Sequence, residues 1–226
     1  MESAMPDLPE AYEPTARTEP TRARERASYD RELVHSILDQ AYVCHLGFVR
    51  DGAPVVLPTL FARVGETLYV HGSTGSRPLR MTGEADPGLP VCLTVTHVDG
   101  LVLARSAFHH SLNYRSVVVH GTAHQVTDPA EKRTALDALV DHAVPGRSTD
   151  SRPANAKELA ATAVARLDLR EVSAKTRTGG PNDELTDLTL PYWAGVIPVA
   201  TEYGAAIPAA DLSDATPVPS YLTGRP

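Results

Sequence analysis

The chain has 226 residues, of which 42 % are hydrophobic, and a formal net charge of −7 at pH 7. This length suits one domain with additions at its ends, and the hydrophobic content supports a packed core. The acidic balance argues against nucleic-acid binding, which needs concentrated positive charge. The 19 prolines and 15 glycines argue against a helix bundle.

Two cysteines, Cys44 and Cys92, are too few for a disulfide scaffold or a multi-thiolate zinc site. Both have apolar neighbours, which predicts buried, reduced thiols. No apolar run approaches the ~18 residues that a membrane span needs. The N-terminus is acidic and lacks the hydrophobic segment of a secretory signal. These features predict a cytoplasmic protein that contacts neither membrane nor nucleic acid.

Residues 1–27 are expected to form a flexible N-terminal arm. Four prolines interrupt any helix between residues 6 and 20, and large apolar residues are few. Arg22, Arg24 and Arg26 form a short basic patch in this segment. The patch leaves two interpretations open: a solvated arm, or an arm that folds over a neighbouring subunit or an anionic ligand.

The first predicted helix begins at Asp30, because apolar residues recur at helical spacing from Leu33 to Ala41. The pattern then changes to β-rich segments, and Asp51-Gly52 is typical of a hairpin turn. The sequence predicts a three-stranded antiparallel meander at residues 42–49, 54–64 and 67–71.

A polar turn follows the meander and leads into a short helix, expected at residues 78–81. Asp99-Gly100 predicts a second hairpin turn further along the chain. The strands expected in this part of the chain cover residues 91–97, 101–107 and 115–126.

Asp128 is a predicted helix N-cap, followed by Pro129 at the first helical position and Glu131 at the third. This helix is expected to end near His142. The remaining elements are a helix at 156–163, a last long strand at 165–170, a loop at 176–191 and a short apolar segment at 193–199.

These elements predict a mainly β fold with peripheral helices. The strands do not alternate regularly with helices, which disfavours a doubly wound parallel sheet. A six-stranded antiparallel barrel fits best, because closure removes the exposed edges of the sheet. We expect this domain to cover residues 28–204 and a Pro- and Ala-rich C-terminal tail to cover residues 205–226.

The stretch from His71 to Arg77 carries the clearest signal for ligand binding. Its glycines let the backbone approach a ligand closely, and three hydroxyls and Arg77 supply donors with no acid nearby. The helix that follows adds N–H groups and a partial positive charge at its N-terminus. This is the chemistry of a phosphate cradle; a polar strand-to-helix turn is the plainer interpretation.

Two further stretches concentrate polar and aromatic groups. His109 and His110 are adjacent, but no third ligand stands at metal-binding spacing, so no metal site is predicted. Lys175 and Arg177 precede Trp193, the only tryptophan, and could face an anionic or flat aromatic ligand. Core packing of Trp193 beside solvated cations is the alternative.

Taken together, four segments resemble the pyridoxamine 5′-phosphate oxidase superfamily of FMN-binding split barrels, and they occur in the order that the family has. The branch they resemble most is that of the nitroimidazole-resistance, flavin-nucleotide-binding proteins. The segments are Tyr29–Phe48, Pro58–Ser73, Asn113–Gly121 and Ser173–Pro198.

This resemblance implies a six-stranded split barrel and a homodimer with two FMN sites at the subunit interface. It places Ser73, Ser76 and Arg77 on the FMN phosphate. His71 would face the substrate side of the flavin and could pass a proton. The other residues implied in cofactor binding are Pro58, Thr59 and Leu60 along the isoalloxazine edge, Arg115 and Ser116 on the central strand, and Lys175, Arg177 and Trp193 in the C-terminal signature.

One position departs from the oxidase pattern. The Ser-Arg pair is followed there by Lys, whereas Pro78 follows Arg77 here. The second cation on the phosphate would therefore come from elsewhere, with Arg80 and Arg63 as candidates. The substrate-binding C-terminal motif of the oxidase is not recognisable, which argues against oxidation of vitamin B6.

The leading functional hypothesis from the sequence is an FMN-dependent oxidoreductase that takes hydride from a reduced nicotinamide and reduces a small organic acceptor. One alternative is a non-catalytic protein that binds FMN, or haem through His109 or His110. Another is a reductase that uses a deazaflavin, whose acidic tail would need the patch of Arg22, Arg24 and Arg26.

Overall fold

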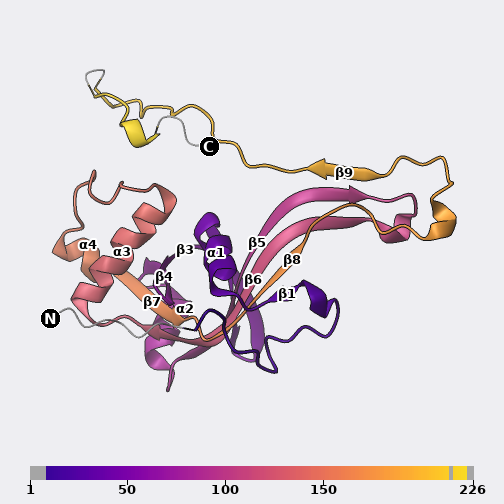
Figure 1. The fold of residues 1–226 in the computed structure, drawn as a ribbon. Coiled ribbons are helices and arrows are strands. Elements are labelled where there is room, and N and C mark those ends of the chain that lie inside the picture. Colours follow the sequence, from indigo (N-terminus) through magenta and orange to yellow (C-terminus); the bar gives the residue numbers. More distant parts are fainter. Residues whose placement is uncertain (1–8, 214–215, 223–226) are drawn as a thin grey trace.

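Six antiparallel strands close into a barrel in the computed structural model, which describes residues 9–213 and 216–222 (Figure 1). They are β2 (Val43–Arg50), β3 (Ala53–Val64), β4 (Thr67–Ser73), β5 (Leu89–Leu103), β6 (Ser111–Gln125) and β7 (Thr162–Asp168). The ring runs β5–β2–β3–β4–β7–β6, and the pairing of β6 with β5 closes it. The split-barrel fold expected from the sequence is confirmed.

The two longest strands extend beyond the barrel. β5 and β6 have 15 residues each and continue together as an arm (Figure 1). β8 (Glu171–Arg177) pairs with β6, and β9 (Gly195–Pro198) pairs with β5. The two-residue strand β1 (Ala27–Ser28) adds to the outer edge of β8.

Asp99 and Gly100 do not form the predicted hairpin turn. They lie inside the continuous strand β5, whose pairing with β6 shifts register between Val98 and Gly100. The Asp99 carboxylate pairs with Arg115 of β6 at 3.0 Å. The prediction was wrong because Asp-Gly also suits an irregularity within a long ladder, where the partner strand decides the outcome.

β7 is not the last long strand. Glu171–Arg177 follows it as β8, so residues 173–177 belong to the sheet, and the predicted loop begins only after Arg177. Val172 and Ala174 alternate with polar neighbours as on a strand, whereas the polar run from Lys175 to Arg177 does not show this pattern in the sequence.

The main helices begin at the predicted capping residues. Asp30 accepts a hydrogen bond from the Leu33 N–H at 2.7 Å, and Asp128 accepts one from the Glu131 N–H at 2.9 Å. The α-helices are α1 (Arg31–Gln40), α2 (Arg77–Glu84), α3 (Pro129–Ala143) and α4 (Ala156–Ala161), with single 3₁₀ turns at Arg24–Arg26, Ala107–His109, Leu185–Asp187 and Ser220–Leu222. α2 is longer than the predicted 78–81.

The barrel interior is filled by aliphatic side chains from all around the ring, and a smaller cluster lies beneath α3. Burial of this apolar surface is the main stabilising term for such a fold. The largest fully buried side chains are Phe61, Ile37, Leu38, Leu68, Leu93, Val34, Val95, Val102, Val117, Val119, Val164 and Val172.

The segment expected as a flexible arm lies against the barrel from residue 9 to residue 28; residues 1–8 are outside the described part. Tyr12 is only 3 % exposed, and its hydroxyl donates to Glu66 Oε2 at 2.9 Å. The Arg31 guanidinium lies 4.0 Å from the centre of the Tyr12 ring. Prolines prevent a helix here, but one buried aromatic residue is enough to anchor an extended segment.

The C-terminal segment returns from the arm toward α3 (Figure 1). Arg147, just after α3, donates from Nη1 to the Tyr221 hydroxyl at 3.1 Å.

Neither cysteine forms a disulfide, and burial raises the pKa of the Cys44 thiol to about 12. Among the described residues, no helix combines the length and apolar character needed to cross a lipid bilayer.

Leu93 provides a test of the barrel core, since its side chain is 1 % exposed. Leu93→Ala should lower the free energy of unfolding by about 2–5 kcal/mol, through lost burial and the cavity left behind. Thr134→Ala, on the exposed side of α3, should change it by less than ~0.5 kcal/mol. Chemical denaturation measures both values, and equal effects would contradict the placement of Leu93.

Candidate functional site

The turn between β4 and α2 has the geometry of an anion site. β4 ends at Ser73, and α2 begins at Arg77 with its positive dipole end toward the turn. Ser76 is the N-cap residue, yet its side chain makes no capping hydrogen bond. A Cβ at Gly72 would lie 3.0 Å from Leu79 Cδ1, so the end of β4 packs closely against α2.

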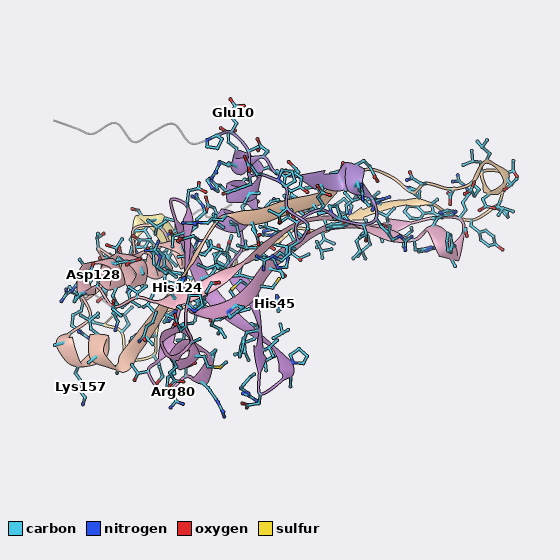
Figure 2. The ribbon with its side chains drawn as sticks, turned by 90° about the horizontal axis from the view of Figure 1, so that it is seen from below. Glu10, His45, Arg80, His124, Asp128 and Lys157 are labelled. Carbon is cyan, nitrogen blue, oxygen red and sulfur yellow. The ribbon has the colours of Figure 1, made fainter. Side chains whose placement is uncertain are left out.

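Arg77 projects from this turn into solvent. Its side chain is 59 % exposed, and Nη2 lies 3.5 Å from Asp51 Oδ2, at the limit of a hydrogen bond. This contact is weak in water and can exchange for a stronger anionic partner. Arg80, the candidate second cation, points outward at the edge of the barrel (Figure 2). Arg63, the other candidate, is bound to Asp39 at 2.8 Å and is held away from that role.

His71 lies on β4, two residues before the end of the strand. Its Nδ1 is buried and has no hydrogen-bond partner among the described residues. Burial lowers the pKa of His71 below its ordinary value, so the neutral imidazole is the favoured form. An unpaired buried nitrogen is costly in a folded protein, so this nitrogen is available for a hydrogen bond.

The residues predicted along the isoalloxazine edge lie on β3. Pro58 and Leu60 point away from the barrel, whereas Thr59 pairs with the buried Cys44. They belong to a surface that we call the β2–β3 face. Its exposed apolar residues are Val43, Val49, Pro54, Val56, Pro58 and Leu60.

A second group of predicted residues lies where the arm leaves the barrel. Arg115 makes a bidentate pair with Asp99, with both N···O distances at 3.0 Å, and this hydrogen bonding raises the pKa of Arg115. Ser116 donates to the backbone oxygen of Lys175 at 3.2 Å. The Lys175 ammonium donates to the Arg22 carbonyl at 3.1 Å, which ties the N-terminal segment to the arm.

Arg177 has a structural role within the arm. It is 8 % exposed, and its guanidinium donates to Asn113 Oδ1 and, at 2.8 Å, to the Gly180 carbonyl. It therefore holds the Gly179-Gly180 segment against β6 and does not face a ligand in this protomer. Trp193, by contrast, is 67 % exposed, so it is not the core residue that the alternative interpretation supposed.

The predicted site residues thus fall into two groups. One surrounds the β4–α2 turn and the β2–β3 face, and the other lies along the arm. The large cavity described below contains Arg115 but none of the residues of the β4–α2 turn. A single protomer brings together the proposed phosphate ligands but does not assemble the whole predicted site.

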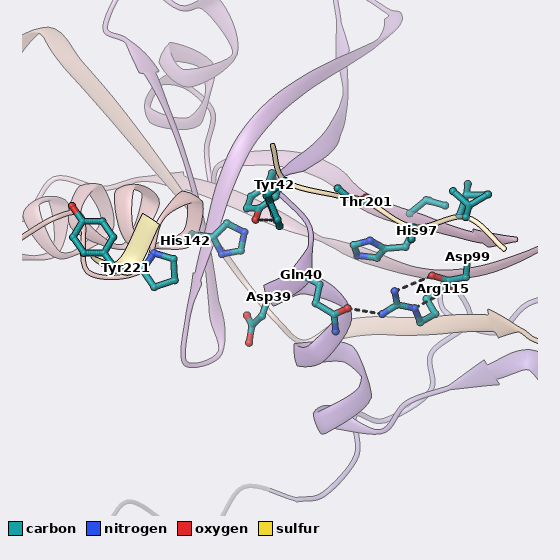
Figure 3. Close-up of a pocket in the computed structure, with 15 residues that line it drawn as sticks. Asp39, Gln40, Tyr42, His97, Asp99, Arg115, His142, Thr201 and Tyr221 are labelled. Carbon is teal, nitrogen blue, oxygen red and sulfur yellow. Dashed lines mark hydrogen bonds and ion pairs between the residues drawn. The ribbon is translucent and has the colours of Figure 1, made fainter. Parts of the chain in front are cut away.

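The sequence did not identify a cavity of about 980 Å³. It lies between the C-terminal end of α1, the middle of β5, the end of α3 and the returning C-terminal segment (Figure 3). Its aromatic and imidazole rings come from His97, His142, Tyr42, Tyr203 and Tyr221. These residues come from distant parts of the sequence and form no local motif. The sequence signal for the cavity is limited to His97, in a predicted strand, and His142, at the end of a predicted helix.

The two histidines of the cavity make the same kind of hydrogen bond. His97 Nε2 lies 3.0 Å from the Ile37 carbonyl oxygen, and His142 Nε2 lies 2.6 Å from that of Ala41. A carbonyl only accepts, so each Nε2 donates its hydrogen.

His109 and His110, the candidate haem ligands from the sequence, lie at the far end of the arm. His110 Nδ1 is 3.0 Å from the Ser106 carbonyl, and His109 Nε2 is 3.7 Å from Glu184. Within residues 9–213 and 216–222, no three His, Cys, Asp or Glu side chains are grouped so that they could hold a metal ion.

Comparison with protein families agrees with this fold. The model of the family described as pyridoxamine 5′-phosphate oxidase matches residues 30–176, more than half of the chain. The chain therefore belongs to the pyridoxamine 5′-phosphate oxidase family. None of the curated proteins matches it.

Two solved structures are similar over nearly the whole chain. The flavocytochrome Anf3 from Azotobacter vinelandii is 40 % identical, with a TM-score of 0.86, and the match covers 95 % of this chain and 97 % of Anf3. The FAD and heme binding protein from Mycobacterium smegmatis is 41 % identical, with a TM-score of 0.83, over 88 % of this chain and 96 % of that one.

A more distant structure shows the same fold. It comes from Bacteroides thetaiotaomicron and is described as a 5-nitroimidazole antibiotic resistance protein; its TM-score is 0.53 at 24 % identity, over 66 % of this chain and 85 % of that one.

The buried imidazole of His71 predicts a pH dependence of stability. Because its pKa is lowered in the fold, the unfolded chain binds the proton first as the pH falls below about 6.5. The free energy of unfolding is therefore unaffected by His71 above about pH 6.5, and it declines as the pH falls from there to the folded-state pKa of His71. His71→Gln should reduce the loss of unfolding free energy between roughly pH 7.5 and 5.5. Denaturant titrations at both pH values measure this, and an unchanged loss would contradict the account.

Proposed function

We propose that this protein binds a flavin at the turn between β4 and α2 and uses it in electron transfer. The observation that carries this proposal is the N-terminus of α2, where Arg77 is exposed and Ser76 makes no capping bond, in a chain of this family. These groups suit a phosphate dianion. The similarity to a flavocytochrome and to an FAD and heme binding protein supports the same conclusion.

FMN and FAD share the phosphate nearest the flavin ring, and Ser73, Ser76 and Arg77 would hold that group in either cofactor. The resemblance of the sequence to FMN-binding split barrels favoured FMN. The relative from Mycobacterium smegmatis is described as binding FAD and is 41 % identical. We therefore propose FAD as the first candidate and FMN as the second, and mass measurement of the released cofactor separates them.

The flavin, when bound, accepts hydride from a donor such as a reduced nicotinamide and passes electrons to a small acceptor. The protein supplies position and electrostatics. His71 is held neutral by burial and has one unpaired nitrogen, so it can accept a hydrogen bond or a proton near the end of β4. We propose His71 as the candidate proton carrier of an oxidoreductase.

We also propose that the functional unit is a homodimer. The β2–β3 face exposes apolar side chains, among them Val56 at 62 % and Leu60 at 45 %. A second copy covering this face would remove the apolar surface from water and bring the arm residues of one protomer toward the phosphate group of the other. Trp193 would then close the site from the partner copy.

A second candidate function is that of a flavocytochrome, a protein that holds haem as well as flavin. It is favoured by the two structures similar over nearly the whole chain, one described as a flavocytochrome and the other as binding FAD and heme. The deazaflavin alternative has weaker support, because Arg26 is drawn toward Glu25 and the Arg22 carbonyl is bound by Lys175.

The phosphate site is tested by Arg77→Ala. Loss of a charge-assisted contact of about 1.5–3 kcal/mol should weaken flavin binding by about 10- to 150-fold. Arg170→Ala is the matched control, since Arg170 is 84 % exposed and lies away from the turn. Fluorescence titration of flavin into apoprotein gives the flavin affinities of both variants. Equal affinities would show that the flavin phosphate does not bind at the N-terminus of α2.

The dimer is tested by placing charge on the β2–β3 face. The double variant Val56→Asp, Leu60→Asp should be monomeric in light scattering and should retain less flavin, because ionised carboxylates are costly to bury. Val140→Asp on α3, where Val140 is 40 % exposed, should leave the dimer intact. A dimeric double variant with full flavin content would refute the proposed interface.

A further inference from the structure

The nine histidines of this chain differ in how far their rings are already engaged by the protein. Four accept or donate a hydrogen bond and a fifth lies 3.7 Å from Glu184; they are His35, His97, His110, His142 and His109. His71 is the residue proposed for the flavin. Within residues 9–213 and 216–222, His45, His120 and His124 have neither a hydrogen bond nor an ion pair. These three imidazoles are open to a ligand.

Two of the three open imidazoles lie on a charged surface. His120 and His124 line a cavity of about 410 Å³, and the charged residues beside them there are Arg17, Asp168, Arg170 and Glu171. His120 is also paired across the sheet with Glu171. Covering charged groups with an apolar ligand is costly, so this surface disfavours one.

His45 lies on a different surface, the β2–β3 face, on the barrel and away from the tip of the arm (Figure 2). It is exposed, and its neighbours across the sheet are Pro58 of β3 and Thr94 of β5. Side chains two residues apart on a strand point to the same face, so Val43 and Gly47 flank His45 along β2. The imidazole therefore stands in the middle of a sheet surface.

The surface around His45 is uncharged and low. Its diagonal neighbours, Val56, Leu60 and Cys92, complete the ring of short or apolar side chains. At Gly47 an added Cβ would have its nearest contact at 3.4 Å, with the Cys92 carbonyl oxygen, so the space above this glycine is open. One imidazole thus rises from an uncharged floor, with room beside it.

This donor set fits an iron porphyrin. Such a group is flat and largely apolar, and it needs an imidazole on the iron and apolar surface against the ring. His45 supplies the imidazole, and the β2–β3 face supplies the apolar surface. The same face is the one proposed to be covered by a second copy, which would shield the porphyrin from water.

We propose that His45 is the axial haem ligand of this protein, with the haem against the β2–β3 face and a second copy as its cover. The proposal rests on the second candidate function, that of a flavocytochrome, and assigns the ligand within this chain. It takes the place of His109 and His110, which lie at the far end of the arm. Because Pro58 borders both His45 and the flavin edge implied by the sequence, haem and flavin would be neighbours.

The test is a hemin titration of the full-length, flavin-loaded protein, followed through the Soret band. His45→Ala should weaken hemin binding by more than about 10-fold, because a change merely around a metal ligand already costs ~10- to 100-fold. His120→Ala is the matched control: it removes an unpartnered histidine from the neighbouring strand β6 and should bind hemin as the parent does.

His45→Met separates an axial ligand from a structural residue. Methionine can replace histidine on the iron, so this variant should keep haem, shift the Soret band and raise the haem reduction potential. A purely structural role of His45 would leave the band and the potential unchanged, which would contradict the proposal.

Flavin content distinguishes the possible failures. A His45→Ala variant that keeps flavin and loses hemin supports the assignment. Parent-like hemin binding by that variant, with loss in His120→Ala or His110→Ala instead, would overturn His45 as the ligand and leave the flavocytochrome intact. A parent protein that binds flavin but no hemin would refute the flavocytochrome, and the ligand with it. Haem held through His45 by a monomer would refute the second copy as its cover.

Discussion

The double pairing of β5 is the constraint on which the structure depends. Residues Val91–Thr94 pair with β2, and the whole strand from Leu89 to Val102 pairs with β6, so one strand both closes the barrel and carries the arm. The hydrogen bonds along β5 pair the backbone N–H and C=O groups of both the barrel and the arm. Because β5 is continuous through Asp99, the position of the barrel determines the position of the arm, and with it the wall of the large cavity.

Two places at the edge of the barrel could take a ligand. At the β4–α2 turn, a helix N-terminus and Arg77 meet solvent without a strong partner. At the root of the arm, the rings of His97 and His142 reach a cavity that the barrel core does not fill.

Much of the fold could be predicted from local sequence. The caps at Asp30 and Asp128 and the turn at Asp51-Gly52 are local signals, and the structure confirms them. Asp99-Gly100 does not form the predicted turn, because its conformation depends on the pairing of β5 with β6. Local sequence does not show that pairing. Arg177 is a cation in a binding-like motif, but its hydrogen bonds to Asn113 and Gly180 make it structural. The cavity could not be predicted, since its residues meet only through the closed barrel and the returning C-terminal segment.

The most direct test of the central claim is the visible absorption spectrum of the purified protein, combined with mass measurement of whatever is released on denaturation. A protein that holds a flavin at the β4–α2 turn should absorb near ~450 nm and release FAD or FMN. A colourless protein that takes up neither added flavin would contradict the account and leave the split barrel without an assigned ligand.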